Sequence, residues 1–244
     1  MPLERDRRTD DAPEPQAPLL TVLMPVYNER ATLPEALQRV LAAPVDKEVL
    51  VVDDGSTDGT REYLRAEVDG RLPGVRVIYL ERNGGKGTAI RAALSLARGE
   101  FVVVQDADLE YDPADLPALL EPAQAGATVV YGTRFRPRTP RMRLPNLVVN
   151  RLLAWMVRVL YGCPLTDEAT CYKLFLREAI LSVPLTCRRF EFCPEVTAKL
   201  LRRGHRIVEV PVRYEARTMA QGKKIRWTDA VTAIWTLLRY RWWR

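Results

Sequence analysis

The stretch FVVVQDADLEYD, residues 101–112, runs from four consecutive apolar residues directly into four carboxylates within seven positions. A continuous β-branched run predicts a strand that is buried on both faces, which is typical of parallel sheets. The carboxylates that follow would repel one another at the end of such a strand, because close charges of one sign are unfavourable. A folded chain therefore needs a reason to keep them there.

The same alternation continues on both sides of this stretch. Further apolar runs stand at residues 20–26, 48–54, 75–81 and 127–132. Between them, residues 29–43, 57–68, 86–99 and 112–126 carry apolar side chains at intervals of three and four, the period of a helix packed on a core. Strands that alternate with helices predict an α/β fold, in which helices flank a mostly parallel sheet.

The character of the chain changes after Gly132, where a basic, Pro-rich segment follows. Helical periods return at residues 146–162, 192–204 and 227–244, and strand-like runs stand at 169–176 and 205–214. We predict a disordered tail over residues 1–18, because it is charged and Pro-rich without an apolar period. One domain would cover 19–226, divided into halves at 134/135, and an amphipathic helix would cover 227–244.

Composition limits the kind of protein this chain can be. With 47% hydrophobic residues among 244, it can bury a full core. Its formal net charge of +6 favours an anionic partner such as a nucleotide or an acidic membrane surface. No stretch approaches the roughly 20 uncharged apolar residues of a membrane span, and the first residues lack the apolar core of a secretory signal. We therefore expect a cytoplasmic protein.

Sites built on cysteine or histidine are disfavoured. The four cysteines, Cys163, Cys171, Cys187 and Cys193, show no CxxC spacing, so free thiols in a reducing compartment are expected. The single histidine, His205, follows a predicted helix. A triad with a histidine base would depend on this one residue, and we discount it.

Polar groups gather at the carboxyl ends of the first five predicted strands, where ligands bind in open α/β sheets. In chain order they are Pro25, Tyr27, Asn28 and Glu29, then Asp53, Asp54, Ser56 and Asp58, then Asn83, Gly84, Gly85 and Lys86, then Asp106, Asp108 and Glu110, and finally Gly132, Thr133 and Arg134. Each group alone is explained by a turn or a helix cap. Together they predict one polar rim.

The acidic cluster within this rim indicates a metal site. Asp106 and Asp108, with Glu110 nearby, offer the oxygen ligands that Mg²⁺ or Mn²⁺ prefers, and such an ion keeps positions open for phosphate oxygens. Zinc is not expected, because no histidine or cysteine falls in the cluster. Asp112 precedes Pro113 and is better explained as a helix cap.

The motifs MPVYNE (24–29), VVDDGSTDGT (51–60), NGGKG (83–87) and DAD (106–108) together resemble glycosyltransferase family 2 with the GT-A fold, a Rossmann-like sheet flanked by helices. The resemblance covers about residues 20–225 and is closest to the branch that makes polyprenyl-phosphate mannose or glucose. It implies that residues 19–134 bind the nucleotide sugar, and that residues 135–226 and the amphipathic helices lie on the acceptor side.

The resemblance also implies a role for each matching residue. The nucleotide-sugar site would comprise Pro25, Tyr27, Glu29, Asp53, Lys86, Asp106, Ala107, Asp108 and Arg134. Of these, the first three would line the base and ribose pocket, and Asp53 would hydrogen-bond the base. The catalytic set would comprise Asp108, Arg134, Lys173, Arg217 and Lys223, of which the last two lie in the late basic loop RTMAQGKKI (217–225). Two positions depart from the family pattern: Glu110 stands where members often carry glutamine, and Lys173 where they tend to carry arginine.

The implied reaction is inverting transfer of a hexose from a nucleotide sugar of the GDP-mannose or UDP-glucose type to a polyprenyl phosphate. A phosphate monoester needs no general base, because its second pKa of about 6 leaves it largely anionic at neutral pH. It needs positive charge instead, which the second half offers at Arg134, Arg136, Arg138, Arg141, Arg143, Lys173, Arg217, Lys223 and Lys224. A hydroxyl acceptor would need a base, for which Asp167, Glu168 and Glu195 are candidates.

Two more distant alternatives are a nucleotidyltransferase, which shares the metal chemistry, and a basic nucleic-acid-binding module. The second lacks a recognition motif, and its acidic strand ends would repel a phosphate backbone, so no nucleic-acid partner is expected.

Two segments are amphipathic. In residues 146–161 apolar side chains follow helical spacing, with Arg151 and Arg158 between them, and the chain ends in RYRWWR. Such helices can lie on a membrane surface, or they can pack on the sheet with their arginines at helix ends. The resemblance favours peripheral contact with a membrane, at the inner face of the plasma membrane, and a homodimer is left open.

Overall fold

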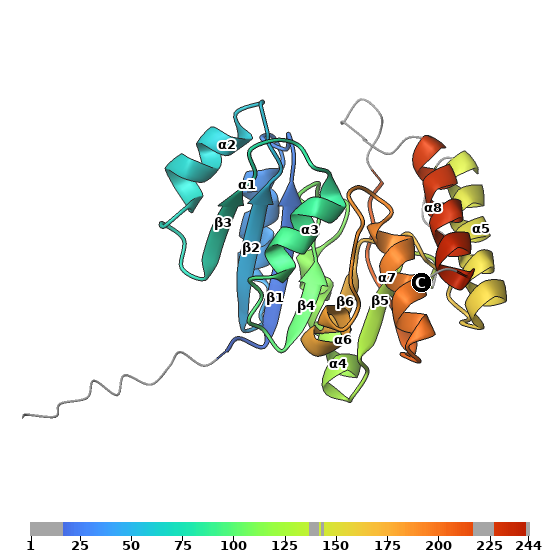
Figure 1. Ribbon diagram of the computed structural model, residues 1–244. Coiled ribbons are helices and arrows are strands. Elements are labelled where there is room, and N and C mark those ends of the chain that lie inside the picture. Colours follow the sequence, from blue (N-terminus) through green and yellow to red (C-terminus); the bar gives the residue numbers. More distant parts are fainter. Residues whose placement is uncertain (1–16, 137–141, 143, 217–226, 243–244) are drawn as a thin grey trace, which may run out of the picture.

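A computed structural model describes residues 17–136, 142, 144–216 and 227–242 of the chain. Its centre is a seven-stranded sheet with the order β3-β2-β1-β4-β6-β5-β7 (Figure 1). The strands are β1 (Leu20–Val26), β2 (Lys47–Asp53), β3 (Val75–Tyr79), β4 (Phe101–Val104), β5 (Val129–Thr133), β6 (Lys173–Leu176) and β7 (Ile207–Pro211). Each of the predicted apolar runs forms a strand, so the predicted α/β fold is confirmed.

Helices cover both faces of this sheet (Figure 1). They are α1 (Leu33–Ala42), α2 (Thr60–Tyr63) with a π-helical turn at Leu64–Val68, α3 (Lys86–Leu94), α4 (Leu116–Gln124) after a 3₁₀ turn at Pro113–Asp115, α5 (Leu144–Tyr161), α6 (Arg177–Leu181), α7 (Phe192–Arg202) and α8 (Trp227–Trp242). The predicted cap is confirmed, since Asp112 Oδ1 accepts a hydrogen bond of 3.0 Å from the backbone N–H of Ala114. The short helix α6 was not predicted.

Strand β6 is the one antiparallel member of the described sheet. It pairs with β4 on one side and with β5 on the other, and both pairings are antiparallel. All other pairings are parallel. Strands β1, β2, β4 and β5 therefore point the same way, and their carboxyl ends meet at one edge. The sheet is continuous across the predicted division at residue 134.

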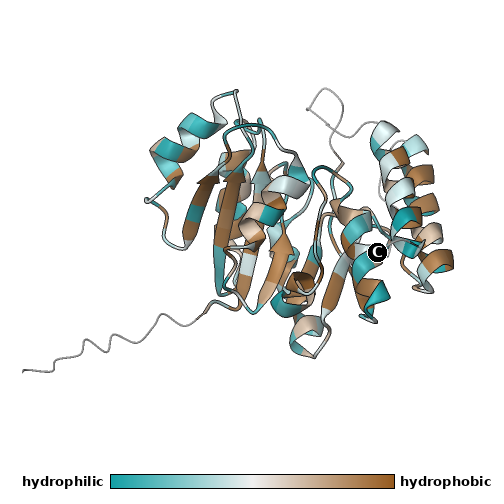
Figure 2. Cartoon of the chain, in the orientation of Figure 1, coloured by the Kyte–Doolittle hydropathy of each residue, from teal (hydrophilic) through white to brown (hydrophobic). Residues whose placement is uncertain are grey.

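The interior explains the apolar runs. All four residues of β4 are buried, as are six of the seven in β1. Figure 2 shows hydrophobic residues concentrated in the strands, whereas the helices mix hydrophobic and hydrophilic residues. Burial on both faces removes the need for alternation along a strand, which is why these strands were predictable from continuous runs.

Helices α5 and α8 pack against each other at one end of the molecule, and α8 also packs on α7 (Figure 1). Leu153 and Val157 of α5 and Leu237 of α8 are buried, so one side of each helix belongs to the core. The other side of each carries exposed apolar residues, Trp155 and Trp235 among them. Within the described ranges no helix is both long and apolar enough to cross a membrane. Residues 1–16 of the predicted tail and residues 243–244 of the predicted terminal helix lie outside the described residues.

Candidate active site

The loops after β1 and β2 are held together by hydrogen bonds. Asn28 N donates to Ser56 Oγ at 3.0 Å, and Thr57 N donates to Asn28 Oδ1 at 2.8 Å. Glu29 N donates to Thr60 Oγ1 at 3.1 Å. Asn28 adopts a φ of +50°, in the left-handed region that asparagine tolerates better than most residues. The two polar motifs therefore form one continuous rim.

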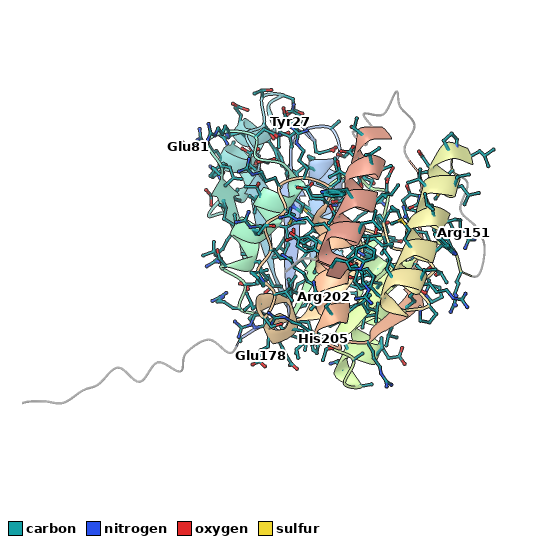
Figure 3. All side chains as sticks on the ribbon, turned by 45° about the vertical axis from the view of Figure 1, so that its right-hand side comes forward. Tyr27, Glu81, Arg151, Glu178, Arg202 and His205 are labelled. Atoms are coloured by element: carbon teal, nitrogen blue, oxygen red, sulfur yellow. The ribbon has the colours of Figure 1, made fainter. Side chains whose placement is uncertain are left out.

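Three residues predicted to line the base and ribose pocket lie on this rim. Pro25, Tyr27 and Glu29 are each partly buried at the end of β1. Glu29 Oε2 accepts a hydrogen bond of 2.9 Å from Thr32 Oγ1, which fixes its carboxylate beside the start of α1. Figure 3 shows Tyr27 at the opposite end of the molecule from His205. His205 Nδ1 lies 2.9 Å from Thr128 Oγ1 and takes no part in the rim.

Asp53, predicted to bond the base, lies just below the rim. Its side chain is fully buried; one oxygen accepts from Ser56 N at 3.1 Å and the other pairs with Arg61 Nε at 2.5 Å. The neighbouring Asp54 accepts from the backbone N–H groups of Gly84 and Gly85 at 2.7 and 2.8 Å. Asp54 thus ties the end of β2 to the NGGKG loop, a contact that the sequence did not predict.

Burial raises the pKa of Asp54 above its ordinary value, although the two backbone hydrogen bonds act in the opposite direction. Glycine is required where these loops meet. Gly55 has a φ of +75°, and a Cβ atom there would lie 2.6 Å from the backbone nitrogen of Asn83. The close approach of the two loops therefore requires glycine at position 55 whether or not a ligand is bound.

Lys86 and Asp106 meet at the centre of the rim, 20 residues apart in sequence. Lys86 begins α3, and its Nζ lies 2.6 and 2.8 Å from the two carboxylate oxygens of Asp106, which follows β4. The Cys171 sulfur lies 3.8 Å from the same Nζ. Burial alone would lower the pKa of Lys86, but Asp106 raises it well above its ordinary value. The lysine is therefore a fixed cation in the site.

The rest of the acidic cluster forms a tight turn. Asp108 Oδ1 accepts from Glu110 N at 3.1 Å, and Leu109 between them has a φ of +63°. A left-handed leucine is strained, and strain of this kind gathers at functional sites. Tyr214, which follows β7, donates from its hydroxyl to Glu110 Oε2 at 3.0 Å. Ala107, between the two aspartates, is buried.

The predicted three-carboxylate metal set is not gathered into one cage. In the part of the chain that the structure describes, no group of three or more histidine, cysteine, aspartate or glutamate residues is placed to hold a metal. Glu110 is directed to Tyr214, while Asp106 is paired with Lys86. The donor chemistry of Asp106 and Asp108 still suits a hard cation, since carboxylate oxygens are the ligands that Mg²⁺ and Mn²⁺ prefer.

Arg134 lies at the end of β5 and is buried. Its guanidinium forms two hydrogen bonds of 2.7 Å with the carboxylate of Asp167 and one of 3.0 Å with Asn150 Oδ1. Its Cζ atom lies 4.9 Å from the ring centroid of Tyr214, the residue that bonds Glu110. Burial alone would lower the pKa of Arg134, but Tyr111 and Asp167 raise it. Arg134 therefore joins the acidic turn through an aromatic neighbour.

Lys173 lies deeper than a substrate contact requires. Its side chain is fully buried, and its Nζ donates to the carbonyl oxygen of Glu168 at 2.7 Å. The same ammonium stands 3.5 Å from the ring centre of Tyr131. Burial raises the pKa of the Glu168 carboxyl. The cation expected near the substrate is thus surrounded by protein, because a carbonyl, a carboxyl and an aromatic face replace its water.

The three candidate general bases are also buried. Asp167 is paired with Arg134, and Glu168 lies beside Lys173. Glu195 accepts hydrogen bonds from Thr186 and Cys187 and pairs with Lys199. All four cysteines are free thiols, as predicted. Arg217, Lys223 and Lys224, together with Arg138, Arg141 and Arg143, lie outside the described residues.

A family model for glycosyl transferase family 2 matches residues 21–181. The match covers more than half of the chain, and the chain therefore belongs to this family. The matched range includes the segments MPVYNE, VVDDGSTDGT, NGGKG and DAD.

Several similar proteins bear the names of sugar transferases or synthases that involve a polyprenyl or polyprenol phosphate. The chain is 36% identical over 185 residues to an undecaprenyl-phosphate 4-deoxy-4-formamido-L-arabinose transferase of Pseudomonas aeruginosa (strain LESB58), covering 72% of this chain but only 52% of that protein. It is 34% identical over 218 residues to an undecaprenyl-phosphate mannosyltransferase of Micrococcus luteus, covering 84% and 86%. A polyprenol monophosphomannose synthase of Mycolicibacterium smegmatis is 31% identical over 91% of this chain and 88% of its own. The chain thus spans about half the length of some relatives and most of others.

Solved structures agree with the fold. Glucosyl-3-phosphoglycerate synthase from Mycobacterium tuberculosis, in complex with UDP, superposes with a TM-score of 0.71 at 24% identity, covering 93% of this chain and 81% of that one. The same enzyme with Mn²⁺, UDP and phosphoglyceric acid gives 0.70 at 22% identity, covering 93% and 80%. These similarities establish a GT-A fold and no more.

Proposed function

We propose that this protein transfers a hexose, with inversion, from a nucleotide sugar to a polyprenyl phosphate. The relatives that match most of their own length with this chain bear the names of an undecaprenyl-phosphate mannosyltransferase and a polyprenol monophosphomannose synthase. A nucleotide sugar of the GDP-mannose or UDP-glucose type is the donor in this proposal. A saccharide or other soluble hydroxyl is the alternative acceptor within the family.

The observation that carries the choice of acceptor is the state of the candidate bases. Asp167, Glu168 and Glu195 are each at most 1% exposed and bonded to other protein groups. A hydroxyl acceptor needs a base within hydrogen-bond reach of its proton, whereas a phosphate monoester is already an anionic nucleophile. The arrangement therefore favours the phosphate.

The donor half of the site follows from the charges at the rim. Lys86 would contact the donor diphosphate, and Asp106 and Asp108 would hold Mg²⁺ or Mn²⁺ with diphosphate oxygens completing the ligand set. Such an ion, when bound, stabilises the negative charge that develops on the leaving diphosphate. Pro25, Tyr27, Glu29 and Asp53 would surround the base and ribose, and Ala107 would pack against the sugar nucleotide.

Arg134 has a positioning role in this proposal. Asp167 and Asn150 fix its guanidinium beside Tyr214, and Tyr214 in turn holds Glu110. Glu110 thereby supports the metal turn without being a required ligand. Lys173 would support the site from below, through Glu168. Arg217 and Lys223 are assigned to the diphosphate or the acceptor phosphate on the family resemblance alone.

Product analysis tests the reaction. The protein is incubated with several labelled nucleotide sugars and a polyprenyl phosphate in detergent, with Mg²⁺ or Mn²⁺ present. We expect a labelled polyprenyl-phosphate sugar and one nucleoside diphosphate per transfer. Label confined to hydroxyl acceptors would end the lipid-phosphate proposal, and formation of pyrophosphate would indicate a nucleotidyltransferase.

The metal assignment has a separate test. Asp108→Asn removes one charged ligand but keeps the oxygen that accepts from Glu110 N. We expect metal-dependent transfer to be lost while the thermal unfolding midpoint stays close to that of the wild type. Full activity of this variant, or of the wild type in excess chelator, would contradict a metal held by Asp106 and Asp108.

We further propose that residues 19–134 form the donor half and residues 135–226 the acceptor half, and that the protein acts at the inner face of the plasma membrane. The exposed apolar sides of α5 and α8 support membrane contact, since a polyprenyl chain resides in the bilayer. A homodimer is compatible with these surfaces, and its test is the mass in solution.

A further inference from the structure

Helix α5 has an exposed apolar stripe along its outer side. Its members are Leu144, Val148, Leu152, Trp155 and Val159, which are between 39% and 70% exposed. Successive helical residues turn by about 100°, so these five side chains fall within an arc of about 80°. A contiguous exposed apolar surface of this kind marks an interaction site.

A basic pocket opens beside this stripe. It has a volume of about 350 Å³ and is lined by Arg136, Arg151, Ala154, Trp155, Arg158 and residues 164–166. By the same helical geometry, Arg151 and Arg158 lie within about 40° of one edge of the stripe. Figure 3 shows Arg151 projecting from the outer side of α5. Three guanidinium groups around one hollow predict an anionic ligand.

The pocket is partly organised in advance. The Arg151 guanidinium stacks on the ring of Phe135 with 4.5 Å between the charge centre and the ring centroid. Ala154, which lies about one helical turn from each of the two arginines, is buried and small and lines the pocket without filling it. The carboxylate of Glu209 lines a smaller neighbouring hollow, where it accepts from the backbone N–H groups of Thr166 and Asp167 at 2.9 and 3.0 Å. The Glu209 carboxylate is therefore directed toward the backbone of residues 166–167.

The pocket has a lining of its own, although Arg136, one of the cations that the sequence offers to an acceptor phosphate, contributes to it. Arg134 is absent from its lining and directs its guanidinium to Asp167, Asn150 and Tyr214 instead. The pocket thus offers a second place for a phosphate, beside the exposed apolar stripe of α5.

We propose that this pocket binds the phosphate headgroup of an anionic phospholipid while the α5 stripe enters the acyl region beside it. The inference rests on the membrane contact of the proposed function. Arginine suits a phosphate because its planar fork donates two parallel hydrogen bonds. Tryptophan beside arginine is the pairing expected at the boundary between headgroups and acyl chains. The bound lipid would orient α5, and with it the site, relative to the bilayer.

Vesicle sedimentation tests this proposal on the full chain. Binding is compared between vesicles of phosphatidylcholine alone and vesicles that also contain phosphatidylglycerol, for the wild type, Arg151→Gln/Arg158→Gln and Arg71→Gln/Arg76→Gln. Arg71 and Arg76, the control pair, are exposed and lie at and just before β3, the first strand in the sheet order. The control variant lowers the net charge by the same amount as the α5 variant. Each basic residue at an anionic surface contributes roughly a factor of five to partitioning, so the α5 pair should lose about 25-fold on the anionic vesicles. The control should change little.

Two further arms separate a headgroup pocket from other sources of binding. Arg151→Lys/Arg158→Lys keeps the charge but removes the fork, and it should bind anionic vesicles several-fold more weakly than the wild type. Val148→Ser/Val159→Ser keeps the pocket and should weaken binding to both kinds of vesicle. Equal binding of the lysine variant and the wild type, or no preference of the wild type for anionic vesicles, would overturn the pocket assignment.

Activity keeps this inference distinct from the proposed function. Sugar transfer to a short, water-soluble prenyl phosphate without a bilayer should be unchanged in Arg151→Gln/Arg158→Gln, because neither arginine belongs to the candidate active site. Loss of transfer in that assay would mean that the pocket serves the acceptor, which contradicts a phospholipid site. Absence of transfer by the wild type would refute the proposed function and leave the vesicle result standing.

Discussion

Two arginine–carboxylate pairs in this protein have nearly the same contact distances and very different surroundings. Asp167 accepts from Arg134 through contacts of 2.7, 2.7 and 3.0 Å, and the two side chains are 0% and 8% exposed. Asp115 accepts from Arg213 through contacts of 2.7, 2.8 and 2.9 Å, with side chains 13% and 59% exposed. Asp167→Asn and Asp115→Asn therefore make the same chemical change in two environments.

The expected costs follow from burial. Removing one partner of a buried pair strands a charge away from water and costs about 3–5 kcal/mol, whereas an exposed pair contributes about 0.2–1 kcal/mol. Urea unfolding measures both, and with an m-value near 3 kcal/mol/M the midpoint should fall by at least about 1 M for Asp167→Asn. Asp115→Asn should shift the midpoint by less than about 0.3 M.

A double variant tests whether the stranded charge causes the loss of stability. Arg134→Gln/Asp167→Asn replaces the buried ions by neutral amides and should recover much of the stability lost by Asp167→Asn alone, because the stranded charge is gone. Sugar transfer should nevertheless stay low in the double variant, since Arg134 no longer lies beside Tyr214 as a cation. Equal midpoints for Asp167→Asn and Asp115→Asn would refute the reasoning.

Three further predictions address the rim and the sheet. Lys86→Met removes the ion pair with Asp106 and should lower kcat/KM for the nucleotide sugar roughly 10- to 100-fold, measured beside Arg39→Gln, which changes an exposed pair on α1. Gly55→Ala should lower the free energy of unfolding by about 3 kcal/mol or more, because the new Cβ would stand 2.6 Å from Asn83 N. Gly126→Ala, with φ +103° and open space around it, should lower it by only about 1–2 kcal/mol of backbone strain. Urea unfolding measures both. Burial alone would raise the pKa of Glu48, but Arg98 and Thr21 lower it, so its contribution to stability is present above its ordinary pKa of 4.5 and is lost as pH falls through the folded value. Glu48→Gln should flatten the acid limb of the stability curve, and an unchanged limb would contradict this assignment.

The sequence predicted the strands well because burial on both faces leaves a local signature. Runs such as FVVV need no partner to be recognised, and the cap at Asp112 is likewise a property of adjacent residues. The position of β6 has no such signature. Its four residues follow a loop, and their insertion between β4 and β5 depends on contacts with strands far away in sequence.

In the candidate site, too, the features that follow from local sequence were predictable, and those that depend on distant contacts were not. The rule that ligands meet strand ends brought Lys86 and Asp106 to one place, and the structure places them in contact. The neighbours that decide how each charge behaves were not predictable. Tyr214 reaches Glu110 across 104 residues, and the burial of Lys173 depends on the ring of Tyr131 from another strand. Charge alone cannot tell a rim lysine from an interior one.

The antiparallel strand β6 has a consequence for how the protein can be divided. A fragment that ends at residue 134 would retain β4 but lose the strand that pairs with it on one side. Its β4 would then be an open edge of apolar residues, and exposed edges of this kind recruit other chains. The donor half is therefore expected to aggregate when expressed alone, and fragment complementation should succeed only where the second fragment supplies β6.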